Sequence, residues 1–166
     1  MGIVCGFYRI NDEMISFLKS NFEKAENYID ENFCWVDGKY HIAEDYVFET
    51  DKAWDIANFL LKKCDPSPDE ALLGINGVKI NPAGDWDSSA YINPEQVKRI
   101  HFVLEQISRE QLIGAYDQQE LIENRVYGGD RFDKSEMDYI LTHVYMIKKA
   151  FSEAAKKGDN IVVHFH

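Results

Sequence analysis

The chain has 166 residues, of which 45% are apolar and 28% charged. These values are typical of a soluble globular protein whose length suits one domain with a substantial core. The formal charge of −11 argues against nucleic-acid binding, whose affinity comes largely from Lys and Arg on phosphates, and against an anionic membrane surface. A basic protein partner is still compatible with this charge, because charge complementarity speeds encounter.

The sequence also predicts where the protein is found. The three cysteines, Cys5, Cys34 and Cys64, are far apart and form no CxxC pair, which favours reduced thiols over a disulfide scaffold. The first ten residues, "MGIVCGFYRI", match neither a signal peptide nor a lipidation motif. No segment approaches the roughly 18 apolar residues of a membrane span. We therefore expect a cytoplasmic protein.

The first elements follow from apolar spacing and turn residues. "GIVCGFYRI" (residues 2–10) is β-branched and aromatic, as in a buried strand. Asn11 can cap a helix, and apolar residues at helical spacing continue to about Asn32, as one helix or a broken pair. Asp37-Gly38 then lies between two short apolar runs, which predicts a tight hairpin.

Residues 49–61, "ETDKAWDIANFLL", predict a capped and mostly buried helix rather than the edge of an active site. Thr50 would cap the helix with its hydroxyl, Asp51 would lie in the first turn, and Trp54 would face the core. At about 100° per residue, the apolar side chains share one sector. Lys52, Asp55, Asn58 and Lys62 share the opposite side.

The later elements are signalled mainly by caps. Residues 72–92 resist assignment, because Gly and Pro interrupt them repeatedly. Asn93-Pro94 with Gln96, and Ser108 with Gln111, each predict a helix start. Asp133 with Glu136 opens a long helix that should end at Gly158, and "NIVVHFH" (residues 160–166) closes the chain as a strand.

Two phenylalanines depart from the helical pattern. Phe59 projects between Lys52 and Asp55, and Phe102 points among charged residues of the helix after Pro94. Each ring is either covered by a further element, such as the Gly-rich middle section, or exposed. Exposed aromatic rings are favoured anchors at protein interfaces.

Two further groups of residues could form sites. "GDWDSSAY" places Asp85 and Asp87 beside Trp86, with Tyr91 nearby, which would suit glycoside hydrolysis or sugar binding. The two carboxylates could also hold a hard cation, although surface turns use the same residues. Arg125 and Arg131 flank a Gly-Gly turn and could hold a phosphate or carboxylate, although pairing with acidic residues is the simpler interpretation. The NTPase, dinucleotide and α/β-hydrolase motifs are all missing.

The histidines give no clear site. His164 and His166 share one strand face at an acceptable metal spacing, but they end the chain, where fraying is expected, and no sequence cluster of Cys or His accompanies them. His143 lies at the edge of the long helix's apolar face and is a weak candidate for a general base. We predict no metal and no cofactor.

The order of these pieces resembles the YfbM-like family, small bacterial proteins whose function is not established. The likeness rests on "MGIVCGFYRI", "TDKAWDIANFLL" (50–61), "ALLG" (71–74), "AYINPEQV" (90–97) and the closing "GDNIVVHF". It departs at "LLKKCDPS", where the family uses a Thr-Gly pair, and at Gly128, where a proline is usual. The resemblance implies an α+β fold and no activity. Some similar small acidic proteins act as immunity proteins, which is only an analogy.

Together these observations predict one α+β domain over residues 1–166, with the first and last strands in a small mixed sheet packed with amphipathic helices. The preferred function is an acidic protein-interaction module, either self-associating or immunity-like, and a role as an enzyme is the less favoured reading. The alternative is a small hydrolase or sugar-binding protein centred on the Asp85-Trp86-Asp87 loop.

Overall fold

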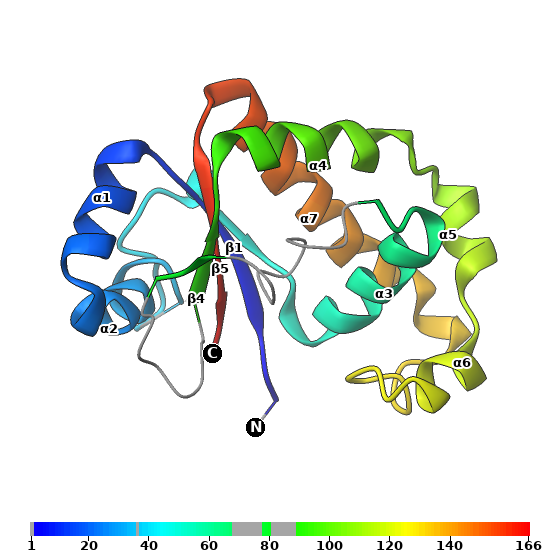
Figure 1. Ribbon diagram of the computed structural model, residues 1–166. Coiled ribbons are helices and arrows are strands. Elements are labelled where there is room, and N and C mark those ends of the chain that lie inside the picture. The colour runs from blue at the N-terminus through cyan, green and yellow to red at the C-terminus, as the bar shows by residue number, and fades with distance from the viewer. Residues whose placement is uncertain (1, 36, 68–77, 81–88) are drawn as a thin grey trace.

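A computed structural model shows a central sheet with helices on both of its faces (Figure 1). It describes residues 2–35, 37–67, 78–80 and 89–166. The strand order is β2-β1-β5-β4-β3. The strands are β1 (Cys5–Ile10), β2 (Val47–Glu49), β3 (Val78–Lys79), β4 (Ser89–Ile92) and β5 (Asn160–Phe165). The first and last strands share one sheet, as predicted, and the structure shows that they pair with each other at its centre. The described pairings are all antiparallel rather than mixed.

The helices divide between the two faces of the sheet (Figure 1). One face carries α1 (Asp12–Ser20) and α2 (Phe22–Asn32). The other carries α3 (Trp54–Cys64), α4 (Pro94–Gln106) and α7 (Met137–Lys157), with α5 (Arg109–Ala115) and α6 (Gln118–Glu123) beyond them. None of the described helices is long and apolar enough to span a membrane.

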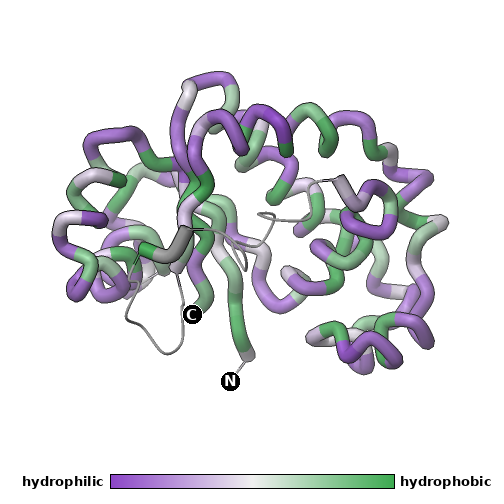
Figure 2. Tube along the Cα trace, in the orientation of Figure 1, coloured by the Kyte–Doolittle hydropathy of each residue, from purple (hydrophilic) through white to green (hydrophobic). Residues whose placement is uncertain are grey.

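The side chains of the two central strands, β1 and β5, point alternately to the two faces of the sheet, and each face has its own hydrophobic core. Phe7 and Val163 pack under α3, α4 and α7, whereas Tyr8 and Val162 pack under α1 and α2. Side chains of a strand point alternately to opposite faces, so a strand covered on both sides is apolar throughout. Figure 2 shows this as hydrophobic colour along β1 and β5, with hydrophilic segments around the outer helices.

Most of the predicted helix ends are confirmed. The side chain of Asn11 caps α1, and capping boxes at Asn93 and Ser108 open α4 and α5. Gly158 ends α7 with a φ of 72°, a conformation that glycine adopts without strain. Of the two alternatives for residues 11–32, the broken pair is correct, since Asn21 separates α1 from α2.

The start of α3 differs from the prediction. Thr50 precedes a short 3₁₀ turn (Asp51–Ala53), but its hydroxyl caps nothing and instead donates to the Cys5 carbonyl at 2.6 Å, tying the turn to β1. Asp51 has a φ of 42° and accepts a hydrogen bond from Tyr139 of α7. Asn58, expected on the polar side, is buried. The local pattern located the helix, but contacts with β1 and α7 set how it begins.

Candidate functional site

A row of residues in register crosses four strands on the sheet face that α1 and α2 cover. Gly6 of β1 lies between Glu49 of β2 and His164 of β5, and His164 lies opposite Ser89 of β4. The Ser89 hydroxyl is hydrogen-bonded to His164 Nδ1 at 2.5 Å. The row therefore brings a carboxylate, an imidazole and a hydroxyl together from segments far apart in the sequence.

Tyr8 lies over the middle of this row because Gly6 has no side chain. A Cβ atom at Gly6 would meet the Tyr8 hydroxyl oxygen at 2.2 Å, so only glycine leaves room for the ring. The hydroxyl donates to Glu49 Oε1 at 2.9 Å and lies 3.3 Å from Cys34 Sγ. The ring also packs against Phe33, with centroids 5.2 Å apart.

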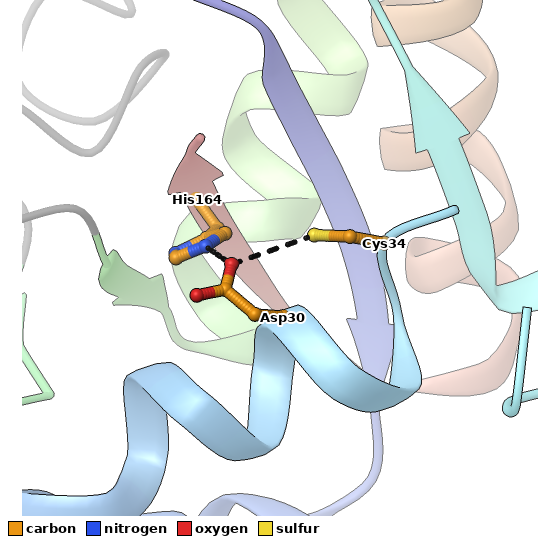
Figure 3. Close-up of side chains that lie close together, drawn as sticks. All are labelled: Asp30, Cys34 and His164. Carbon is orange, nitrogen blue, oxygen red and sulfur yellow. Dashed lines mark hydrogen bonds and ion pairs between the residues drawn. The ribbon is translucent and has the colours of Figure 1, made fainter. Parts of the chain in front are cut away.

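Helix α2 supplies the groups that face His164 (Figure 3). Asp30 is in the last turn of α2, and Cys34 follows the helix end, four residues later. Asp30 Oδ1 lies between the two others, 2.7 Å from His164 Nε2 and 3.8 Å from Cys34 Sγ. Burial of Phe33 against the sheet holds this end of the helix down, so Cys34 points toward β1 and β5.

A second histidine, His166, also lies near the Cys34 thiol. His166 Nε2 lies 3.4 Å from Glu49 Oε2, and its ring stacks on that of His164 with centroids 5.8 Å apart. Two sets of possible metal ligands result, each with its ligand atoms within 4.8 Å of one another: Asp30, Cys34 and His164, and Cys34, Glu49 and His166. We call these five residues the Cys34 cluster.

The Cys34 cluster is buried on the sheet side and open on the other. Cys34 and His164 are 4% and 1% exposed, whereas the Asp30 side chain is 51% exposed. Burial lowers the pKa of His164, which the Asp30 carboxylate partly opposes. Hydrogen bonds with Cys34 and Glu49 raise the pKa of His166 to about 10. The two imidazoles therefore favour different charge states, although they are stacked on each other.

Sequence reasoning missed most of this cluster. It noted the spacing of His164 and His166 but found no Cys or His near them in the chain; the fold brings Cys34, Asp30 and Glu49 to them. The four-residue spacing from Asp30 to Cys34 at a helix end was the one local signal available. The prediction of no metal rested on the missing cluster, and it is not tested by the fold itself.

The two phenylalanines have different environments. Phe59 is partly buried and packs against the core under α3, α4 and α7. Phe102 is 69% exposed. The rings therefore do not form one shared exposed surface, and of the two only Phe102 still fits an interface role.

The other predicted site residues are dispersed over the molecule. Arg125 and Arg131 are exposed on the edge of one groove of about 240 Å³. Tyr91 is partly buried, with Lys19 Nζ 3.9 Å from its ring centroid. Asp85, Trp86 and Asp87 lie outside the described residues, so the hydrolase or sugar-binding hypothesis stays a prediction.

Two further residues, His143 and Trp54, contact neighbouring parts of the chain. The His143 ring packs edge-on against that of Tyr139, with the ring centroids 4.5 Å apart. The buried Nδ1 of His143 has no hydrogen-bond partner among the described residues. Trp54 is half-buried, stacks on Tyr127 and donates from Nε1 to the Ile3 carbonyl. Trp54 therefore holds the N-terminal segment, where the sequence predicted only core packing.

Comparisons with known proteins agree on a family and a fold. A solved structure, the protein of unknown function YfbM from Escherichia coli, has a TM-score of 0.68, 16% sequence identity, and coverage of 98% of this chain and 99% of that chain. At this identity the likeness shows the α+β fold alone. Among curated proteins no match was found. The model of the domain of unknown function DUF1877 matches residues 1–164, and the chain therefore belongs to the DUF1877 family, for which no specific function is shown.

Proposed function

We propose that this protein binds divalent transition-metal ions of the zinc type at the Cys34 cluster. One observation carries the proposal: a thiol, two imidazoles and two carboxylates lie close together around Cys34 Sγ. They come from α2 and the segment after it, from β2, and from β5 and the residue after it. Sulfur and nitrogen ligands favour zinc and its neighbours in the first transition row, whereas magnesium and calcium prefer oxygen alone.

Two distances between ligand atoms of the cluster are near those that a zinc ion requires. In a tetrahedral zinc site, nitrogen and oxygen ligands are separated by about 3.3 Å, and sulfur and oxygen by about 3.5 Å. His166 Nε2 and Glu49 Oε2 are 3.4 Å apart, and Asp30 Oδ1 and Cys34 Sγ are 3.8 Å apart. The 2.7 Å between Asp30 and His164 must open by about 0.6 Å. A rotation of the partly exposed Asp30 side chain would supply this.

Neighbouring groups orient the ligands, as they do in known metal sites. Ser89 holds Nδ1 of His164, which leaves Nε2 directed at the cluster. A serine hydroxyl can accept as well as donate, so it can still pair with Nδ1 when that nitrogen carries the proton. The Tyr8 hydroxyl restrains Glu49 in the same way. Metal binding would release the Cys34 thiol proton and one ring proton of His166, whose pKa is raised to about 10. His164, whose pKa is lowered, would bind through Nε2 in its neutral form with the ring proton on Nδ1.

The test uses the full chain, freed of metal by chelation and titrated with Zn²⁺, Co²⁺ and Mg²⁺. We expect saturable zinc binding, no magnesium binding, and a thiolate-to-cobalt charge-transfer band in the near ultraviolet. Cys34→Ser should remove the band and weaken zinc binding by at least about tenfold. Cys64→Ser is the matched control, because Cys64 lies on α3, across the sheet. Wild-type protein that binds no zinc, or an unchanged band in Cys34→Ser, would overturn the proposal.

A second candidate function is self-association through the α4–α7 side of the molecule. Phe102 and Tyr145 are 69% and 62% exposed there. A groove of about 490 Å³ between α4, α5 and α7 contains Tyr145. Its lining has four cations and two carboxylates: Arg109, Lys148, Lys149 and Lys156 against Glu105 and Glu153. In a chain of charge −11, this basic lining complements the acidic surface of a second copy.

Light scattering at rising concentration and at two salt concentrations tests this candidate. We expect a dimer at low salt that Phe102→Ser and Tyr145→Ser convert to monomer. Trp35→Ser is the control, since Trp35 is 59% exposed on the opposite side, beyond α2. A monomer at every concentration and salt would refute self-association and leave the metal proposal unaffected. The cytoplasmic location expected from the sequence stays a prediction.

A further inference from the structure

We propose that the Cys34 cluster holds two metal ions bridged by the Cys34 thiolate, an inference that rests on the proposed metal-binding function. One ion would be held by Asp30, Cys34 and His164. The other would be held by Cys34, Glu49 and His166. The two ligand sets share a single atom, Cys34 Sγ.

The pairing of the side chains favours two ions over one. Each imidazole faces its own carboxylate: His164 is 2.7 Å from Asp30, and His166 is 3.4 Å from Glu49. The carboxylates come from different elements, α2 and β2. The histidine rings lie parallel, 11° apart in plane, with centroids separated by 5.8 Å. They are side by side, one on β5 and one on the residue after it, rather than turned toward one common point.

The spacing of the strand suits a pair of ions. Residues two apart in a strand are separated by about 6.6 Å along it, and paired metal ions are about 3.5–4 Å apart. Each histidine can thus serve one ion, while the sulfur lies between the two. A single tetrahedral ion would use four of the five ligands and leave the fifth, a buried or half-buried polar group, without a role.

The number of ligands and the total charge are both consistent with two ions. With the thiolate counted for both ions, each ion has three protein ligands, which leaves one open position for water in a tetrahedral shell. Two divalent ions carry +4, and Cys34, Asp30 and Glu49 carry −3 once the thiol has lost its proton. One metal-bound hydroxide would neutralise the remaining charge, since such water loses a proton near neutral pH.

The burial of the ligands also gives the ions a route of entry. Cys34 and His164 line the closed side of the cluster at 4% and 1% exposure. The side chains of Asp30, Glu49 and His166 are 51%, 22% and 29% exposed. Each ion would therefore meet at least one partly exposed ligand first and the buried thiolate last.

The test counts ions per chain by equilibrium dialysis against Zn²⁺ followed by elemental analysis, on wild-type protein and matched variants that retain the native circular dichroism. We expect two zinc ions per wild-type chain. Asp30→Asn should keep one, and Glu49→Gln should keep the other one. Glu31→Gln, an exposed carboxylate beside Asp30 on α2, is the control and should keep two.

A spectroscopic measurement distinguishes a bridge from two separate ions. Two cobalt ions joined by one sulfur couple magnetically, so the paramagnetic resonance signal per cobalt should fall as the second ion binds. One zinc ion per wild-type chain, with affinity reduced in both carboxylate variants, would refute the pair and leave the metal-binding function standing. No zinc at all would refute both. Two ions whose cobalt signals add without coupling would refute the thiolate bridge.

Discussion

Gly6 lies directly opposite His164 in the register of β1 and β5, and its missing side chain provides the space in which the Tyr8 hydroxyl lies. The tyrosine in turn connects Glu49 to Cys34. A single glycine thus allows the three side chains to meet. Burial raises the pKa of Tyr8, with the Glu49 carboxylate adding to the effect, so the hydroxyl keeps its proton and acts as a donor.

Replacing Gly6 by alanine should displace Tyr8, because the new methyl group would lie 2.2 Å from its hydroxyl oxygen. Overpacking of this kind destabilises proteins by about 1–3 kcal/mol. We expect that loss in the free energy of unfolding, measured by urea denaturation, together with weaker zinc binding. Gly114→Ala is the control, since nothing lies within 4 Å of its Cβ position, and alanine in a helix should be neutral or stabilising by up to about 1 kcal/mol. Equal stability of Gly6→Ala and wild type would contradict this account.

The hydroxyl of Thr50 should stabilise the fold through β1 rather than as a helix cap. It is fully buried and donates to the Cys5 carbonyl at 2.6 Å. Thr50→Val keeps the shape and removes the donor, so we expect a loss of about 1–2 kcal/mol in unfolding free energy. Thr142→Val provides the comparison, because Thr142 is exposed and donates only to the Asp138 carbonyl within α7. An equal loss of unfolding free energy in the two variants would show that the buried Thr50 hydrogen bond stabilises the fold no more than the exposed Thr142 bond does.

The helix ends that the sequence predicted correctly are those decided by nearby residues. The caps at Asn11, Asn93 and Ser108 depend on a side chain and the backbone three residues away. The end of α7 depends on Gly158 alone. Such signals lie within one window of sequence, so they can be found without knowledge of the rest of the chain.

The Cys34 cluster was missed because it depends on pairing between distant segments. Asp30 and His164 are 134 residues apart, and Ser89 and His164 are 75 apart. They meet only after β5 has inserted between β1 and β4 in one register, and a shift by one residue would turn His164 to the other face. The same limit explains Asn58, which lies on the polar side of α3 by spacing but is covered by neighbouring elements.

The stability of the protein should depend on pH through His143. Burial lowers the pKa of this imidazole, although the Asp51 carboxylate partly opposes the shift. The unfolded chain titrates near about 6.5, so below that pH it binds a proton more readily than the folded chain does. The His143 contribution to stability is thus complete above about pH 6.5 and is lost as the pH falls through the lowered folded pKa.

Nuclear magnetic resonance of the histidine ring protons, with urea denaturation across the same pH range, checks this prediction. His143 should titrate below its ordinary value, and His143→Gln should flatten that part of the stability profile. His41→Gln is the control, since His41 is exposed. A His143 midpoint at or above about 6.5 would show that the nearby carboxylate outweighs burial.

Zinc should stabilise the fold, because its ligands join three parts of the chain: α2 with the segment after it, β2 and β5. A ligand that binds only the folded state raises the unfolding free energy by about 2.7 kcal/mol at a hundred times its dissociation constant. Urea denaturation with zinc and with chelator should show a difference of this size in wild type and in Cys64→Ser, and little in Cys34→Ser. Hydrogen exchange should slow at the end of α2, since the ion would join the half-exposed Asp30 side chain to the buried His164. Equal unfolding free energies with zinc and with chelator would contradict this prediction. Either the ion does not bind, or it binds the thiols and histidines of the unfolded chain as tightly as it binds the folded protein. The zinc titration of the folded protein distinguishes these two explanations.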